Sequence, residues 1–145
     1  MSEGIGREDL KNGAVNHEKM SFGGRLKTFS WSGICPLTGV TDNHTLGVPS
    51  QDFQITKISA SWDKDGAGSG NKVAIDIFDD GATVLSSVMD FITATDTIDT
   101  PEDAALDAAK TLVAKGSLLQ LNLVGSGTTT AGHHIGVEVE GHYVD

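Results

Sequence analysis

Alternation of apolar and polar residues constrains this chain more than any other feature of its sequence. The clearest run is residues 119–123, in which three leucines alternate with Gln120 and Asn122. Residues 73–77 and 135–143 alternate in the same way. Successive side chains of a β-strand point to opposite faces, so each run has one apolar and one polar face. Short runs of this kind predict antiparallel sheets that pack face to face.

The same patterns place the individual strands. We expect strands at residues 26–32, 53–62, 73–78, 83–89, 119–123 and 135–143. The alternation changes phase at Thr56 and Lys57, which fits a β-bulge. A turn at residues 79–82 predicts a hairpin, and the last two strands are expected to form a second, longer hairpin. Residues 34–50 contain many turn-forming residues and predict a long loop.

One segment departs from the β pattern. Thr100 suits a helix N-cap, Pro101 the first helical position, and the alanine-rich run that follows ends before Gly116. We therefore expect one short helix at residues 101–110, although residues 111–113 could equally begin a strand. The glycine content, 18 of 145 residues, fits many short strands joined by turns. The predicted fold is all-β, an antiparallel, jelly-roll-like sandwich with one short helix.

The chain divides into an extended N-terminal arm, residues 1–24, and a β-sandwich domain, residues 25–145. Apolar residues of the arm follow no period of 2 or 3.6, so the arm lacks the pattern of a packed element. Either it is a frayed tail or it becomes ordered on a partner. In the second case the partner-binding residues of the arm are Ile5, Leu10, Val15, Met20 and Phe22.

Charge and composition exclude several classes of protein. The formal net charge of −10 repels nucleic acid and anionic membranes, so we expect neither as a partner. No apolar run is long enough to span a membrane, and the first residues lack a signal-peptide pattern, so we expect a soluble protein that is not exported by a signal peptide. Cys35 is the only cysteine, so no disulfide forms within the chain.

The candidate sites are weak, and we predict neither a metal, nor a cofactor, nor an enzymatic activity. Residues 63–71 are acidic and glycine-rich but lack the spacing of a calcium loop. On a strand, His134 and His142 would share a polar face with Glu138 and Glu140. These two histidines would lie about 26 Å apart, too far to share one ion. Motifs typical of hydrolases, metalloproteases and nucleotide-binding loops are missing.

Two tryptophans allow a second interpretation. Trp31 and Trp62 could stack on sugars, but their phase within the predicted strands favours positions in the core.

Residues 53–62, 114–123 and 136–143 resemble the strands of small jelly-roll proteins from tailed-phage particles, over roughly residues 50–144. The resemblance implies a capsid decoration (cement) protein on the outer surface of the virion. Such a protein would form a homo-oligomer, typically a trimer, at junctions between capsomers, and its arm would bind the major capsid protein. It would be synthesised in the host cytoplasm. The alternative is a carbohydrate- or receptor-binding module, such as a phage fibre or tail knob. An enzyme of the jelly-roll barrel type is a third interpretation.

Overall fold

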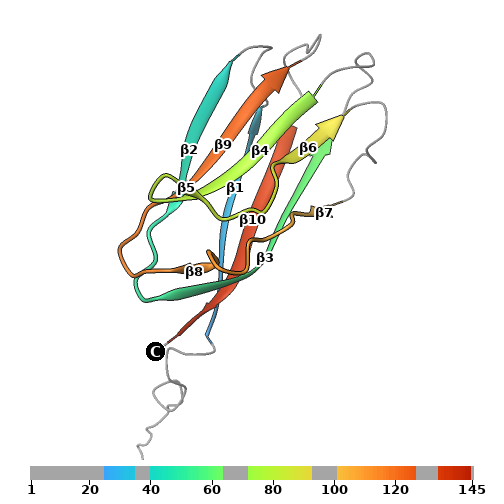
Figure 1. Ribbon diagram of the computed structural model, residues 1–145. Helices are drawn as coiled ribbons and strands as arrows, with labels where there is room; N and C mark the ends of the chain where they lie inside the picture. Colours follow the sequence, from blue (N-terminus) through green and yellow to red (C-terminus); the bar gives the residue numbers. More distant parts are fainter. Residues whose placement is uncertain (1–24, 35–39, 64–71, 93–100, 127–133, 145) are drawn as a thin grey trace, which may run out of the picture.

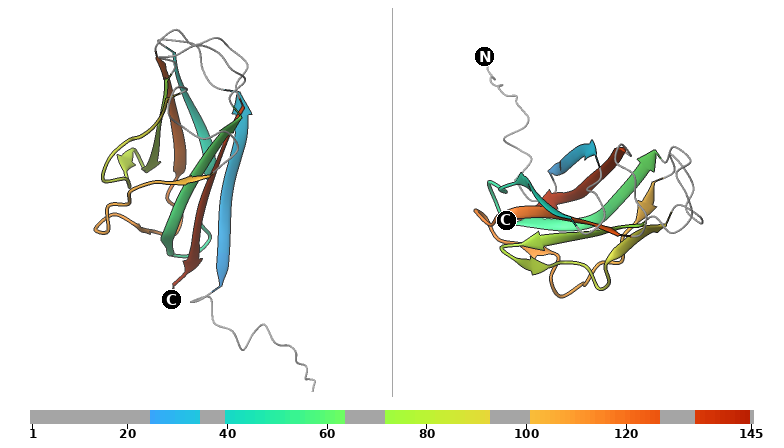
Figure 2. Two further views of the ribbon diagram at one scale, coloured as in Figure 1. Left: turned by 90° about the vertical axis from the view of Figure 1, so that its right-hand side faces the viewer. Right: turned by 90° about the horizontal axis from the view of Figure 1, so that it is seen from above.

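The computed structural model describes residues 25–34, 40–63, 72–92, 101–126 and 134–144, and these form an all-β sandwich. Two antiparallel sheets of five strands each face one another (Figures 1 and 2). None of the described residues is helical. The arm lies outside the described residues, so its boundary at residue 24 stays a prediction.

The strands follow a jelly-roll order. The first sheet contains β1 (Leu26–Ile34), β10 (His134–Tyr143), β3 (Phe53–Asp63), β7 (Glu102–Asp103) and β8 (Leu112–Val113). The second contains β2 (Thr41–Gly47), β9 (Leu119–Ser126), β4 (Lys72–Asp79), β5 (Ala82–Thr83) and β6 (Met89–Ile92). Both β7 and β8 pair with β3, and both β5 and β6 pair with β4. If each pair of short strands counts as one interrupted strand, each sheet has four strands, in the orders β1-β10-β3-β7/β8 and β2-β9-β4-β5/β6, as in a jelly roll.

The apolar alternation of the sequence forms the core. Ile75 and Ile77 of β4, Leu121 of β9, and Val137 and Val139 of β10 are all at most 1% exposed. Burial of one such side chain stabilises the fold by about 1.5–3 kcal/mol. The predictions of strands at residues 26–32, 53–62, 73–78, 119–123 and 135–143 are therefore confirmed, as is the sandwich.

The predicted bulge in β3 is also confirmed. Lys57 pairs with Glu140 but Ile55 pairs with Gly141, which leaves Thr56 as the extra residue. The two strands approach closely at this point. A Cβ atom on Gly141 would lie 2.1 Å from the carbonyl oxygen of Gln54, so only glycine fits there.

The predicted helix at residues 101–110 is wrong. The N–H of Ala104 donates to the Ile58 carbonyl at 2.8 Å, which ties this segment to the first sheet. Ala104 and Leu106 pack against the core. Because strands already present satisfy the backbone groups, tertiary contacts outweigh a helix propensity of a few tenths of a kcal/mol per residue. The alternative strand at residues 111–113 corresponds to β8.

Three further predictions need correction. Residues 34–50 are not all loop, because β2 lies within them. Residues 83–89 form no continuous strand: β5 ends at Thr83 and β6 begins at Met89. The strands at residues 119–123 and 135–143 form no hairpin, because β9 and β10 belong to opposite sheets. The hairpin of β4 and β5 is confirmed.

Candidate partner-binding surface

The two lateral sides of the sandwich differ in construction. On the side of β5, β6, β7 and β8, hereafter the closed side, the chain passes between the two sheets. There the N–H of Ser86 donates to the Ala105 carbonyl, and the N–H of Asp107 donates to the Val84 carbonyl, both at 2.9 Å. Leu85 forms an isolated bridge with Leu106. These contacts join the sheet edges and leave only two- to four-residue strands there.

The opposite side, hereafter the open side, consists of β1, β2 and the residues that flank β2. Here β1 is nine residues long and β2 is seven, and no described residue pairs with their outer edges. Among the described residues six large apolar side chains are exposed, and four of them lie on the open side. These four are Leu26 (87% exposed), Ile34 (53%), Val40 (40%) and Val48 (53%). Unpaired backbone together with exposed apolar side chains marks a surface for another protein chain.

An aromatic contact holds β1 and β2 together. The ring of Trp31 stacks on that of His44 with centroids 4.3 Å apart and an interplanar angle of 24°. The indole also covers Gly33, where a Cβ atom would lie 2.5 Å from it. Trp31 packs against the core, in agreement with its predicted structural role. The side chain of Trp62 lies outside the described residues.

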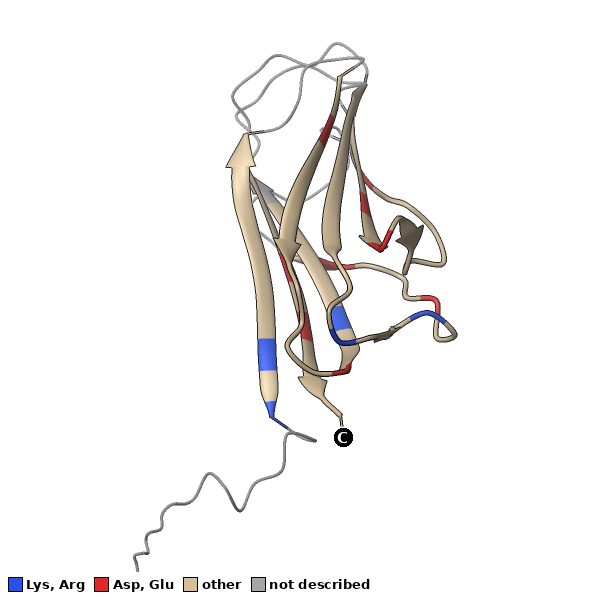
Figure 3. Ribbon diagram, turned by 90° about the vertical axis from the view of Figure 1, so that its left-hand side faces the viewer, with Lys and Arg blue, Asp and Glu red and all other residues tan. Residues whose placement is uncertain are grey.

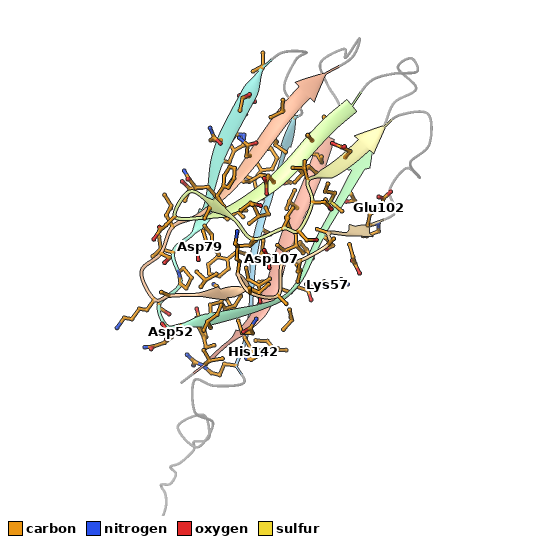
Figure 4. All side chains as sticks on the ribbon, in the orientation of Figure 1. Asp52, Lys57, Asp79, Glu102, Asp107 and His142 are labelled. Atoms are coloured by element: carbon orange, nitrogen blue, oxygen red, sulfur yellow. The ribbon has the colours of Figure 1, made fainter. Side chains whose placement is uncertain are left out.

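The outer face of the first sheet is polar. Glu138 and His134 are exposed and Glu140 and His142 are half-buried, all opposite the buried residues of β10, so the predicted polar face is confirmed. Lys57, opposite Glu140, forms an ion pair with Asp103 at 3.9 Å (Figure 4). A shallow groove of about 430 Å³ lies beside this row. Polar and apolar residues line it together: Ser30, Ser32, Ser59, Ser61 and Glu138, with Trp31, Ala60, Pro101, Gly136 and Val137.

Acidic residues are distributed along the sandwich, whereas the basic residues of β1 and β3 lie near the end at which β1 begins (Figure 3). Asp79, at the end of β4, has a raised pKa. Burial is the main cause, the neighbouring Asp80 adds to it, and a hydrogen bond with Ser117 opposes it. The Oδ1 atom of Asp79 is buried and has no hydrogen-bond partner among the described residues.

The described residues contain no group of three or more side chains placed to hold a metal ion. They also include no helix long and apolar enough to cross a membrane. Most of the acidic loop at residues 63–71 lies outside the described residues. So do the proposed binding residues of the arm, which are Ile5, Leu10, Val15, Met20 and Phe22. The sequence missed the open side because β2 has a mostly polar sequence, although its alternate residues are half-buried.

Neither a protein-family model nor a curated protein sequence matches this chain. Among solved structures, a chain of the cyanophage Pam1 capsid asymmetric unit matches with a TM-score of 0.59 and 15% sequence identity. The match covers 92% of this chain and 96% of that one. The fold is shared with a viral capsid component.

Two other matches are more distant. One is FLHE, with a TM-score of 0.42 and 13% identity over 82% of this chain and 99% of that chain. The other is infectious bursal disease virus, Gx strain, with a TM-score of 0.34 and 12% identity over 82% of this chain and 31% of that chain.

Proposed function

We propose that this protein is a structural, non-enzymatic component of a phage virion that binds the outer surface of the capsid and stabilises contacts between capsomers. The match to a chain of the Pam1 capsid asymmetric unit carries this proposal. That match includes nearly the whole of both chains, so the capsid chain is itself a single sandwich of about this size. A module of this size suits a protein added to a shell built by a larger one. We infer that the major capsid protein is the partner and that the copies form trimers.

The position of the chain ends supports attachment at one end of the sandwich. The N–H of Tyr143 donates to the Arg25 carbonyl at 2.9 Å, so β1 begins where β10 ends (Figures 1 and 2). The arm, residues 1–24, therefore joins the sandwich at this end. Extended segments of this kind bind partners through apolar side chains placed in grooves and through main-chain hydrogen bonds.

The alternative, a carbohydrate-binding module, receives less support from the described residues. Glycan sites of such modules present aromatic rings on exposed loops or faces. None of the six exposed large apolar side chains of the described residues is aromatic. The groove on the outer face of the first sheet is lined by four serines and Glu138 together with apolar residues, and its one aromatic lining residue, Trp31, already stacks on His44.

Truncation of the arm tests the proposal. A chain that begins at Gly24 should keep its β circular dichroism spectrum and its melting temperature, because every core residue that the structure describes follows Gly24. Its affinity for purified capsid shells that lack the protein should fall at least tenfold in a co-sedimentation assay. A matched variant keeps the arm length but replaces Ile5, Leu10, Val15, Met20 and Phe22 by serine. Undiminished binding by both variants would overturn the role of the arm, and absence of binding by the full chain would overturn the capsid function.

A further inference from the structure

The hydrogen-bond phase of β1 shows which of its backbone groups are unused. Arg25 and Tyr143 are joined by a hydrogen bond and lie opposite each other in the β1–β10 register. Bonded pairs in an antiparallel ladder recur at every second residue. Odd-numbered residues of β1 therefore bond to β10, and even-numbered ones direct their N–H and C=O groups away from the sheet. These outward residues are Leu26, Thr28, Ser30, Ser32 and Ile34.

The same reasoning applies to β2. The N–H of Gly125 donates to the Val40 carbonyl at 3.1 Å, and Thr41 pairs with Val124. Even-numbered residues of β2 therefore bond to β9, whereas Thr41, Asn43 and Thr45 direct their backbone groups outward. No described residue forms a main-chain hydrogen bond with these outward N–H and C=O groups of β1 or β2. Two strand edges that are paired with none of the described residues thus lie on one side of the molecule.

These two edges are complementary to each other. In the antiparallel sandwich β1 runs away from the end that carries the arm and β2 runs back toward it (Figure 1). Their outward residues are exposed on both strands. The Asp and Lys side chains of these strands are Lys27 of β1 and Asp42 of β2, which carry opposite charges, so pairing opposes no like charges.

Symmetry decides how copies can pair. Rotation about an axis parallel to the strands changes neither the direction of a strand nor the height of its residues along the axis. β1 of one copy can therefore meet β2 of the next copy in the antiparallel sense. Pairing of β1 with β1 instead needs a two-fold axis across the strands, which places the two arms at opposite ends. The proposed function requires all arms to face one shell, and in this respect alone the inference rests on it.

The level of each strand sets the register. Within one copy Trp31 stacks on His44, so these residues lie at the same level. The rotation therefore brings Ser30 opposite Thr45 of the next copy, and Ser32 opposite Asn43 of the next copy. In this register the exposed Ile34 lies beside Val40 of the next copy at one end of the seam, and Leu26 lies beside Val48 of the next copy at the other.

We propose that β1 of one copy pairs with β2 of the next copy, which closes a ring of copies around the open side with every arm at the same end. The partner of the open side is thus a second copy of this chain. The pairing adds main-chain hydrogen bonds and covers the four exposed apolar side chains of this side.

Cysteine cross-linking tests the pairing in solution without any shell. In a Cys35→Ser chain, one variant carries Ser30→Cys and another carries Thr45→Cys. Bonded residues of an antiparallel pair have Cα atoms about 5.5 Å apart, which suits a disulfide. Within one copy the two side chains occupy outer faces of opposite sheets, which lie about 10 Å apart, and cannot join. A mixture of the two variants should give a covalent dimer under mild oxidation, and neither variant alone should.

A control and a second variant keep the result interpretable. A mixture of Ser87→Cys, which lies on the closed side, with Thr45→Cys should give no covalent dimer. Ser30→Pro removes one outward N–H, a change that edge strands tolerate, so the folded protein should elute as single copies. A product from Ser30→Cys alone, or no product from the mixture, would overturn the pairing. Because shells take no part, this outcome is separate from failure of the capsid function.

Discussion

The closed side and the open side end the same two sheets in opposite ways. On the closed side the sheets are joined by β5 to β8 and by main-chain hydrogen bonds between residues 84–86 and 105–107. On the open side the outer edges of two long strands, β1 and β2, pair with no described residue, and neither strand contains a proline. The closed side satisfies its edges within one copy, whereas we propose that the open side pairs with a second copy. Contacts on the first should govern folding, and those on the second should govern association.

The two sides should differ most in how much a leucine-to-alanine substitution on each lowers the free energy of unfolding. Leu85→Ala removes a side chain that is 4% exposed on the closed side. The resulting cavity should lower the free energy of unfolding by about 2–5 kcal/mol. Leu26→Ala on the open side removes one that is 87% exposed. It should change that free energy by about 0.5 kcal/mol or less in single copies.

Urea denaturation at a concentration low enough for single copies measures both changes. Equal losses in the two variants would mean that the open side contributes to folding as the closed side does. The comparison between the sides would then fail.

The apolar pattern predicted the sheets because burial depends on alternation, which residues 119–123 and 135–143 display without interruption. The bulge at Thr56 was predictable for the same reason, since an extra residue shifts the phase. Strand pairing was not predictable from alternation. Residues 119–123 and 135–143 are neighbours in sequence with a turn-rich segment between them, yet the jelly-roll order places them in opposite sheets.

The predictions for residues 101–110 and for β2 were wrong for a different reason. Residues 101–110 have good helix-capping signals, but hydrogen bonds to both layers of the sandwich satisfy their backbone groups, and the half-buried Leu106 packs against the core. Such tertiary contacts leave no local signal. The sequence of β2 is mostly polar, and its half-buried His44 packs against Trp31 rather than against a hydrophobic cluster. Because β2 was not predicted from the sequence, the open side was not predicted either, and the only binding residues proposed from the sequence were those of the arm.

A glycine at the end of β2 sharpens the comparison further. A Cβ atom on Gly47 would lie 2.6 Å from Cδ1 of Phe29, a ring in the core between β1 and β2. Gly47→Ala should displace this ring and lower the free energy of unfolding by about 1–3 kcal/mol. Gly136→Ala is the matched control, because its Cβ atom would meet Ser61 Oγ at an ordinary 3.7 Å.

Thermal melts of the two alanine variants separate the outcomes. If only Gly47→Ala lowers the melting temperature, Phe29 packs tightly against Gly47 in the interior of the open side. Equal melting temperatures would show that the Phe29 ring can move aside without loss of stability.

The smallest effect should come from Asp79, next to the turn that leads into the closed side. Its raised pKa, caused mainly by burial, means that the folded state holds the proton more tightly than the unfolded state. The free energy of unfolding is then greatest below the ordinary pKa of the carboxyl group. It falls as pH rises from that value through the raised pKa. Asp79→Asn keeps an acceptor for Ser117 and removes the charge.

The variant should therefore melt at a slightly higher temperature than the natural chain at neutral pH, and the difference should close as pH falls to the ordinary pKa of the carboxyl group. Glu138→Gln removes one negative charge from the exposed face of β10 and controls for the change in net charge. If both variants gain equally at neutral pH, relief of the overall charge of −10 explains the gain. If only Asp79→Asn gains, the buried Oδ1 atom of Asp79 is a cost that the closed side carries in order to join the two sheets.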